Sequence, residues 1–69
     1  MNIQIHSEYI TLAQLLKSTD LISSGGEAKY FLAEVKVLVN GETEQRRGRK
    51  LYPGDTVVIS GLTYRIQAS

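Results

Sequence analysis

The sequence predicts a single α+β domain, in which two adjacent helices pack on a small, mostly antiparallel sheet of four to five strands. Three observations support this class. Apolar residues alternate with polar ones at the start of the chain, they repeat with helical spacing in the next two stretches, and short β-branched runs separated by turn signals fill the second half. The chain has 69 residues, of which 42% are apolar. This is the size of one domain with a small core, so residues 1–69 are expected to form a single domain.

The opening residues indicate a first strand and a first helix. Ile3 and Ile5 alternate with polar neighbours, which is the period of a strand, and residues 7–10 are expected to form a connection. Thr11 is expected to begin the helix, because Thr11 and Gln14 have the spacing of a capping box. The apolar face of this helix repeats at positions i, i+3 and i+4, namely Leu12, Leu15 and Leu16.

A second helix is predicted from Ser24 to about Val35, because Ser24 and Glu27 have the spacing of another capping box. Its amino end is lined by glycines and carries a partial positive charge, which makes it a candidate phosphate site. Lys29 and Lys36 are expected to share one face of the helix. The alternative is an ordinary capped helix with a solvated lysine face. The core stripe is expected at Ala28, Phe31, Leu32 and Val35.

Antiparallel strands joined by tight turns are expected in the second half of the chain. Asn40-Gly41 is a strong signal for a two-residue hairpin turn between a strand at 37–39 and a polar strand at 43–45. Pro53-Gly54 suits a type II turn. The last two strands are expected on either side of Gly61, at residues 56–60 and 63–67.

The composition argues against several classes of protein. There is no cysteine, and His6 is the only histidine, so we expect no disulfide, no metal site and no cofactor. No set of residues resembles a catalytic triad, a paired-carboxylate site or a phosphate loop, so we do not expect an enzyme. An apolar run of membrane-spanning length and a signal peptide are also missing, so we expect a cytoplasmic monomer without membrane contact.

Positive charge is concentrated in one segment. The net charge is only +1, yet four of the eight basic residues fall within residues 46–50, the segment called the arginine loop below. Arginine binds phosphate through two parallel hydrogen bonds and stacks on bases, so the arginine loop predicts binding of nucleic acid. The alternative is a solvated loop balanced by Glu42 and Glu44. Tyr30 and Tyr52 are candidates for stacking on unpaired bases, or else are half-buried core residues.

The order of these features resembles a known family. A helix, the segment Ser-Ser-Gly-Gly-Glu-Ala-Lys at 23–29, a second helix, the segment Val-Leu-Val-Asn-Gly-Glu at 37–42, a basic stretch and Pro53-Gly54-Asp55 follow the pattern of the S-four RNA-binding domain, or αL motif. The chain is most similar to small free-standing bacterial members of the YaaA type. It departs from the usual pattern at Gly25, where the family usually has arginine, and at Val35 and Leu38.

The resemblance implies a non-catalytic domain that binds structured RNA, either ribosomal or transfer RNA, in ribosome assembly or translation. In the family the two helices and the following loop form the RNA-binding face. The expected partners are therefore RNA and the ribosome. The expected site residues are Ser24, Gly25, Gly26, Lys29, Lys36, Arg46, Arg47, Arg49 and Lys50.

Two other functions remain open from the sequence. Sulfur carriers of the ThiS or MoaD kind have a similar length and a similar order of elements. Their chemistry requires a carboxy-terminal Gly-Gly, whereas this chain ends in Gln67-Ala68-Ser69, which argues against that function. A protein-interaction domain that uses an edge of the sheet is the other alternative, and its binding would not depend on the arginine loop.

Overall fold

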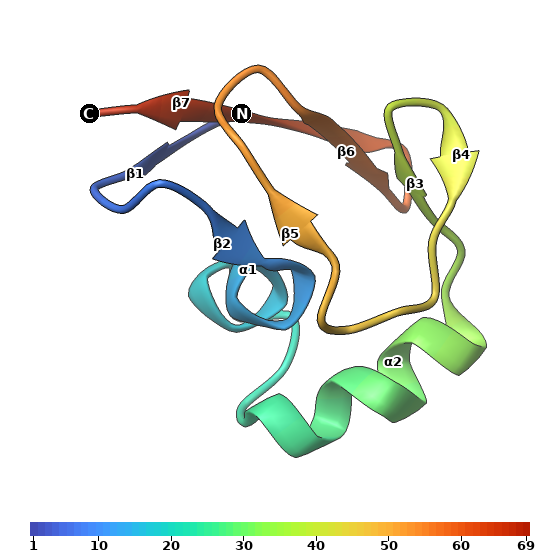
Figure 1. Cartoon of the computed structure of the whole chain (residues 1–69). Coiled ribbons are helices and arrows are strands. Elements are labelled where there is room, and N and C mark those ends of the chain that lie inside the picture. Colours follow the sequence, from blue (N-terminus) through green and yellow to red (C-terminus); the bar gives the residue numbers. More distant parts are fainter.

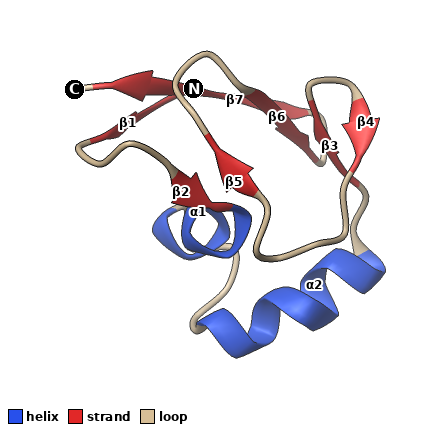
Figure 2. Cartoon of the chain, in the orientation of Figure 1, coloured by secondary structure: helices blue, strands red, loops and turns tan.

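The computed structural model describes all residues 1–69 and confirms the predicted α+β class (Figure 1). The helices α1 (Leu12–Ser18) and α2 (Ala28–Glu34) lie on one side of the main sheet, as Figure 2 shows. Neither helix is long and apolar enough to cross a membrane. The strands of the main sheet are β1 (Asn2–Ile5), β3 (Val37–Val39), β4 (Glu42–Thr43), β6 (Thr56–Ile59) and β7 (Leu62–Ala68).

The main sheet has the strand order β1-β7-β6-β3-β4. Only β1 and β7 run parallel, and the other pairs are antiparallel, as predicted. The hairpin turn between β3 and β4 is confirmed, because Asn40 and Gly41 have φ angles of 51° and 86°, both in the left-handed region that this turn requires. The type II turn is confirmed by a φ of 100° at Gly54.

The capping box of α1 is confirmed. The Gln14 N–H donates to Thr11 Oγ1 at 3.2 Å, and the Thr11 N–H donates to Gln14 Oε1 at 2.8 Å. The apolar face of α1 then packs on the sheet, with the side chains of Leu12, Leu15 and Leu16 fully buried. These leucines form one core with residues of the sheet, including Val37, Val39, Val57, Ile59, Tyr64 and Ile66.

The predicted capping box at the second helix is wrong. Ser24 makes no side-chain cap, and the Glu27 N–H, which its hydroxyl would cap, donates to the Ser24 carbonyl oxygen at 3.1 Å. The chain therefore enters α2 through a 3-10 turn (η1, Gly25–Glu27). The prediction that Lys29 and Lys36 share a helix face is also wrong, because Val35 takes an extended conformation and ends the helix before Lys36.

A second, two-stranded sheet was not predicted. It joins β2 (Ile10–Thr11), in part of the expected connection, to β5 (Lys50–Leu51), with Ile10 opposite Leu51 and Thr11 opposite Lys50. The strand expected at 43–45 is also shorter, since β4 ends at Thr43. The arginine loop therefore runs from a short hairpin to a short sheet that is anchored at the start of α1.

Candidate nucleic-acid interface

The backbone of the arginine loop is bound to the amino end of α1. The Leu12 N–H donates to the Arg49 carbonyl oxygen at 2.8 Å, and the Ala13 N–H donates to the Arg47 carbonyl oxygen at 2.9 Å. The Thr11 hydroxyl oxygen accepts a hydrogen bond from the next backbone N–H, that of Gln14. The free amides of the first turn are therefore satisfied within the protein, and this helix end has none left for a phosphate.

Glu44 holds two arginines of the loop in place. Its side chain is 8% exposed, and its carboxylate accepts hydrogen bonds from Arg46 Nε and Nη2, both at 3.0 Å, and from Arg49 Nη1 at 2.8 Å. The backbone N–H groups of Gln45 and Arg46 donate to the same carboxylate. Both oxygens of this buried carboxylate therefore accept hydrogen bonds from the loop and the residue before it, which holds the loop against the protein.

The pKa of Glu44 follows from these contacts. Its hydrogen bond to Arg46 lowers the pKa from 4.5 to about 2, with a further contribution from Arg49, and these effects outweigh burial, which raises it. The same contact raises the pKa of Arg46 above its ordinary value. Of the two acidic residues expected to balance the loop, only Glu44 forms ion pairs, and Glu42 is exposed without one. The sequence did not indicate that Glu44 would be buried.

An open hollow lies beside the loop. It is lined by Arg46, Gly48, Arg49, Lys50, Tyr52 and Asp55. Lys50 Nζ lies 4.9 Å from the centre of the Tyr9 ring, and the Tyr9 and Tyr52 ring centres are 5.6 Å apart. Tyr9 was missed by the sequence analysis. Tyr9 directly precedes Ile10, and the unpredicted pairing of Ile10 with Leu51 brings Tyr9 beside Lys50 and Tyr52, two residues that line the hollow.

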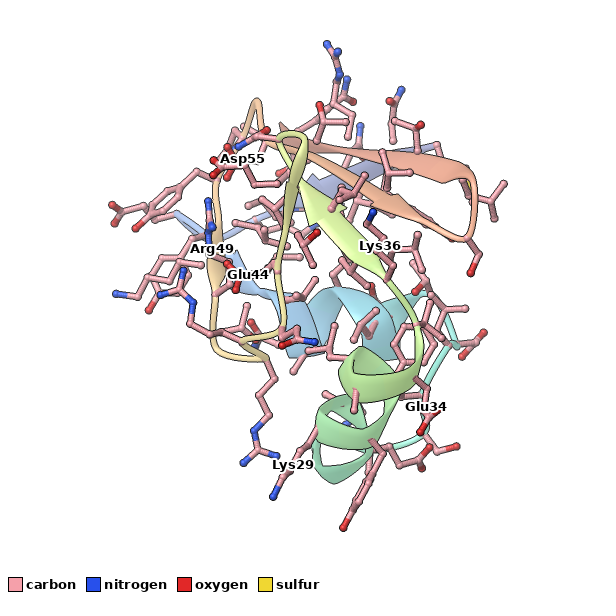
Figure 3. The ribbon with its side chains drawn as sticks, turned by 90° about the vertical axis from the view of Figure 1, so that its right-hand side faces the viewer. Lys29, Glu34, Lys36, Glu44, Arg49 and Asp55 are labelled. Carbon is pink, nitrogen blue, oxygen red and sulfur yellow. The ribbon has the colours of Figure 1, made fainter.

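The other predicted site residues are distributed unequally around the loop. Arg47 is exposed and forms no ion pair. Gly25 and Gly26 lie in η1, Ser24 precedes it, and all three residues are exposed. The N–H groups of the two glycines donate to no acceptor in the protein. In Figure 3, Lys29 and Arg49 lie on the same side of α2 and β3, whereas Lys36 lies beside β3. The structure thus gathers Arg46, Arg49 and Lys50 in one hollow and separates Lys36 from them.

The opposite side of α2 has a different character. A second hollow there is lined by Leu21, Ile22, Glu27, Tyr30, Phe31, Glu34 and Val35, and it contains no basic residue. Glu34 points to this side in Figure 3, away from Lys29. Tyr30, which is 71% exposed, lines this second hollow and not the one with Tyr52 beside the arginine loop. No group of three or more His, Cys, Asp or Glu side chains is placed to hold a metal ion.

Comparison with known proteins gives consistent matches over nearly the whole chain. The family model described as "S4 domain" matches residues 3–67. A Bacillus subtilis protein named "Probable ribosome maturation protein RlbA" is 61% identical over 59 residues, which cover 86% of this chain and 83% of that protein. An Escherichia coli protein named "Putative RNA-binding protein YbcJ" is 35% identical over 60 residues, which cover 87% of this chain and 86% of that protein.

Proposed function

Because the chain belongs to the S4 domain family, we propose that it is a non-catalytic protein that binds structured RNA, ribosomal or transfer RNA, through the arginine loop and the neighbouring start of α2. The names of two relatives, one for ribosome maturation and one for RNA binding, support this function. They also favour a role in ribosome assembly over one in transfer-RNA metabolism. The family match also favours RNA binding over the sulfur-carrier alternative.

The observation that carries the proposal is the fixed geometry of the arginine loop. Arginine side chains lose much conformational freedom when they bind, and this loss weakens binding. Here Glu44 restrains Arg46 and Arg49 before any ligand arrives. A guanidinium has five N–H donors, so Arg46 keeps donors for a phosphate after using Nε and Nη2 on Glu44, and its side chain is 75% exposed.

Arg47 and Lys29 extend this surface, and their side chains do not hold the fold together. Both side chains are exposed, and neither forms an ion pair with the protein. They are the best positions for a test, because reversing the charge of Arg46 or Arg49 would leave the buried carboxylate of Glu44 beside a second negative charge. Such variants would disturb the loop itself and would not separate binding from folding.

The test compares Arg47→Glu and Lys29→Glu with Arg65→Glu in binding to a ribosomal RNA hairpin at several salt concentrations. Arg65 is a matched control, because it is exposed on β7 between the buried Tyr64 and Ile66 and therefore lies on the outer face of the sheet. All three variants lower the net charge equally. We expect Arg47→Glu to weaken binding about tenfold and to reduce the salt slope by about 1, with a smaller loss for Lys29→Glu.

Equal losses in all three variants would contradict the proposed surface, since they would show that only net charge matters. Unchanged binding by folded Arg47→Glu and Lys29→Glu proteins would also contradict it. If the folded, unmodified protein binds no RNA at any salt concentration, the alternative of a protein-interaction domain that uses an edge of the sheet is favoured.

A further inference from the structure

The hollow beside the arginine loop combines two kinds of chemistry. Three of its lining residues, Arg46, Arg49 and Lys50, are cations, and one, Tyr52, is aromatic. Cations alone are sufficient to hold the phosphates of a paired stem. An accessible aromatic ring adds a surface on which a base stacks only when that base is unpaired.

The Tyr52 ring is accessible and is supported by its neighbours. It is 42% exposed, and the Tyr9 ring lies 5.6 Å away at an angle of 47°, with the Lys50 ammonium group over the Tyr9 ring. The Tyr9 ring is therefore already engaged by Lys50, while Tyr52 lines the hollow. The arrangement provides one free aromatic surface with a second ring beside it.

The backbone of Tyr52 is also fixed. The Tyr52 N–H donates to Asp55 Oδ2 at 2.8 Å, and the Asp55 N–H donates to the Tyr52 carbonyl oxygen at 2.9 Å across the type II turn. The Asn40 side-chain amide Nδ2 donates to Asp55 Oδ1, and this bond ties the turn to the β3–β4 hairpin. The turn therefore presents the ring without any backbone segment having to become ordered when a ligand stacks on it.

The two ends of the hollow carry opposite charges. Asp55 lines it at the Tyr52 turn, so a phosphate would be repelled at that end. The cations Arg46, Arg49 and Lys50 supply the opposite field at the arginine loop. A nucleotide in the hollow would thus place its phosphate at the loop and its base over Tyr52.

We propose that this hollow binds a single unpaired nucleotide of the RNA, with the phosphate on the arginine loop and the base stacked on Tyr52. This inference rests on the proposed RNA-binding function and adds the class of RNA, a stem that carries a bulged or looped-out nucleotide. It assigns a binding role to Tyr52 and a supporting role to Tyr9 and Lys50.

The test uses two RNA hairpins that differ only in one bulged nucleotide within the stem. We expect the protein to bind the bulged hairpin about fivefold or more tightly than the fully paired one. Tyr52→Leu is expected to lower the affinity for the bulged hairpin to that for the paired one, which removes this preference. Tyr52→Phe keeps the ring and is expected to retain the preference. Tyr30→Leu, which removes an exposed ring from the other hollow, is the matched control and is expected to change neither affinity.

Equal affinity of the unmodified protein for the two hairpins would overturn the inference but leave the proposed function standing. A preference that survives in Tyr52→Leu would overturn it as well. Failure to bind either hairpin would contradict both proposals. If Tyr52→Leu does not fold, titration of the unmodified protein with adenosine 5′-monophosphate and with ribose 5-phosphate decides the matter. Only the nucleotide should shift the NMR signals of Tyr52, and equal shifts from both would refute stacking.

Discussion

The starts of α1 and α2 carry the same kind of capping sequence but have opposite structures. Thr11 and Gln14 form a complete capping box, and the arginine loop covers the remaining amides of the first turn. Ser24 and Glu27 have the same spacing, but they form no side-chain cap and leave the Gly25 and Gly26 amides open. One helix start is closed by the protein, and the other is accessible to solvent.

The difference shows how tertiary contacts decide the outcome of a local signal. Leu12, the first residue of α1, is fully buried, so its turn is held against the core and receives the arginine loop. The two glycines before α2 are exposed, and the chain takes a 3-10 turn there in place of a capped first turn. The closed start supports the arginine loop, and the open start lies beside Lys29 at the proposed surface.

Removing the buried side chain at the closed start should have the largest effect. Leu12→Ala is expected to lower the free energy of unfolding by about 2–5 kcal/mol, because it empties a site that is 0% exposed. Tyr30→Ala, on the exposed part of α2, is the comparison and should change it by about 0.5 kcal/mol or less. Urea unfolding of both variants measures the difference, and similar losses would contradict the burial of Leu12 in the core at the closed start.

Glu44→Gln tests the contacts that hold Arg46 and Arg49 in the arginine loop next to the closed start. The pKa of Glu44 is 4.5 ordinarily and about 2 in the folded protein, so its stabilising contribution is complete above pH 5 and is lost as the pH falls toward 2. We expect Glu44→Gln to be less stable than the unmodified protein at pH 7, and the gap to narrow between pH 5 and pH 2. Thermal unfolding across this range measures it. A gap that does not change with pH would contradict the assigned role of the carboxylate.

Replacing Thr11 and Ser24 by alanine, one at a time, compares the two helix starts directly. Thr11→Ala should cost about 1 kcal/mol of unfolding free energy, because the Thr11 hydroxyl accepts from the Gln14 amide. Ser24→Ala should cost less than about 0.5 kcal/mol, since the Ser24 side chain makes no cap. Chemical unfolding of the pair checks this. Equal costs would mean that Ser24 caps α2 in solution.

Adding a cation at the open start should give the smallest effect. Gly25 has no positive φ angle, and a Cβ atom there would meet no atom within 4 Å, so Gly25→Arg should not disturb the fold. We expect it to tighten RNA binding about two- to fivefold at low salt, through one additional exposed contact with phosphate. Gly25→Gln has a long, uncharged side chain and serves as the control. An equal gain from Gln, or no gain from Arg, would show that RNA does not approach this position.

The parts of the fold that local signals determine could be predicted from the sequence. The Asn40-Gly41 hairpin, the Pro53-Gly54 turn and the Thr11 capping box each depend on a few consecutive residues, and all three are confirmed. The β2–β5 pair depends on contacts between segments about forty residues apart, and residues 10–11 are too short for a periodic signal. Lys36 was misplaced because the end of α2 at Val35 carries no glycine or proline.

The candidate site could be predicted in its charges but not in its geometry. The cluster of Arg46, Arg47, Arg49 and Lys50 is visible as a basic run. Burial of Glu44 under two of these arginines was not visible, because an acidic residue in a polar strand is usually exposed. The position of Tyr9 beside Lys50 and Tyr52 was not visible either, because it depends on the unpredicted β2–β5 pairing.

The central claim is that the arginine loop, held on the closed start of α1, is the surface that meets RNA. An NMR titration of the labelled protein with a ribosomal RNA hairpin at two salt concentrations tests it most directly. The account predicts shifts that cluster in the arginine loop and at Gly25, Gly26 and Lys29, and that shrink as salt increases. Shifts confined to β1 and β7, or to the acidic hollow around Tyr30 and Glu34, with an unperturbed arginine loop, would contradict it.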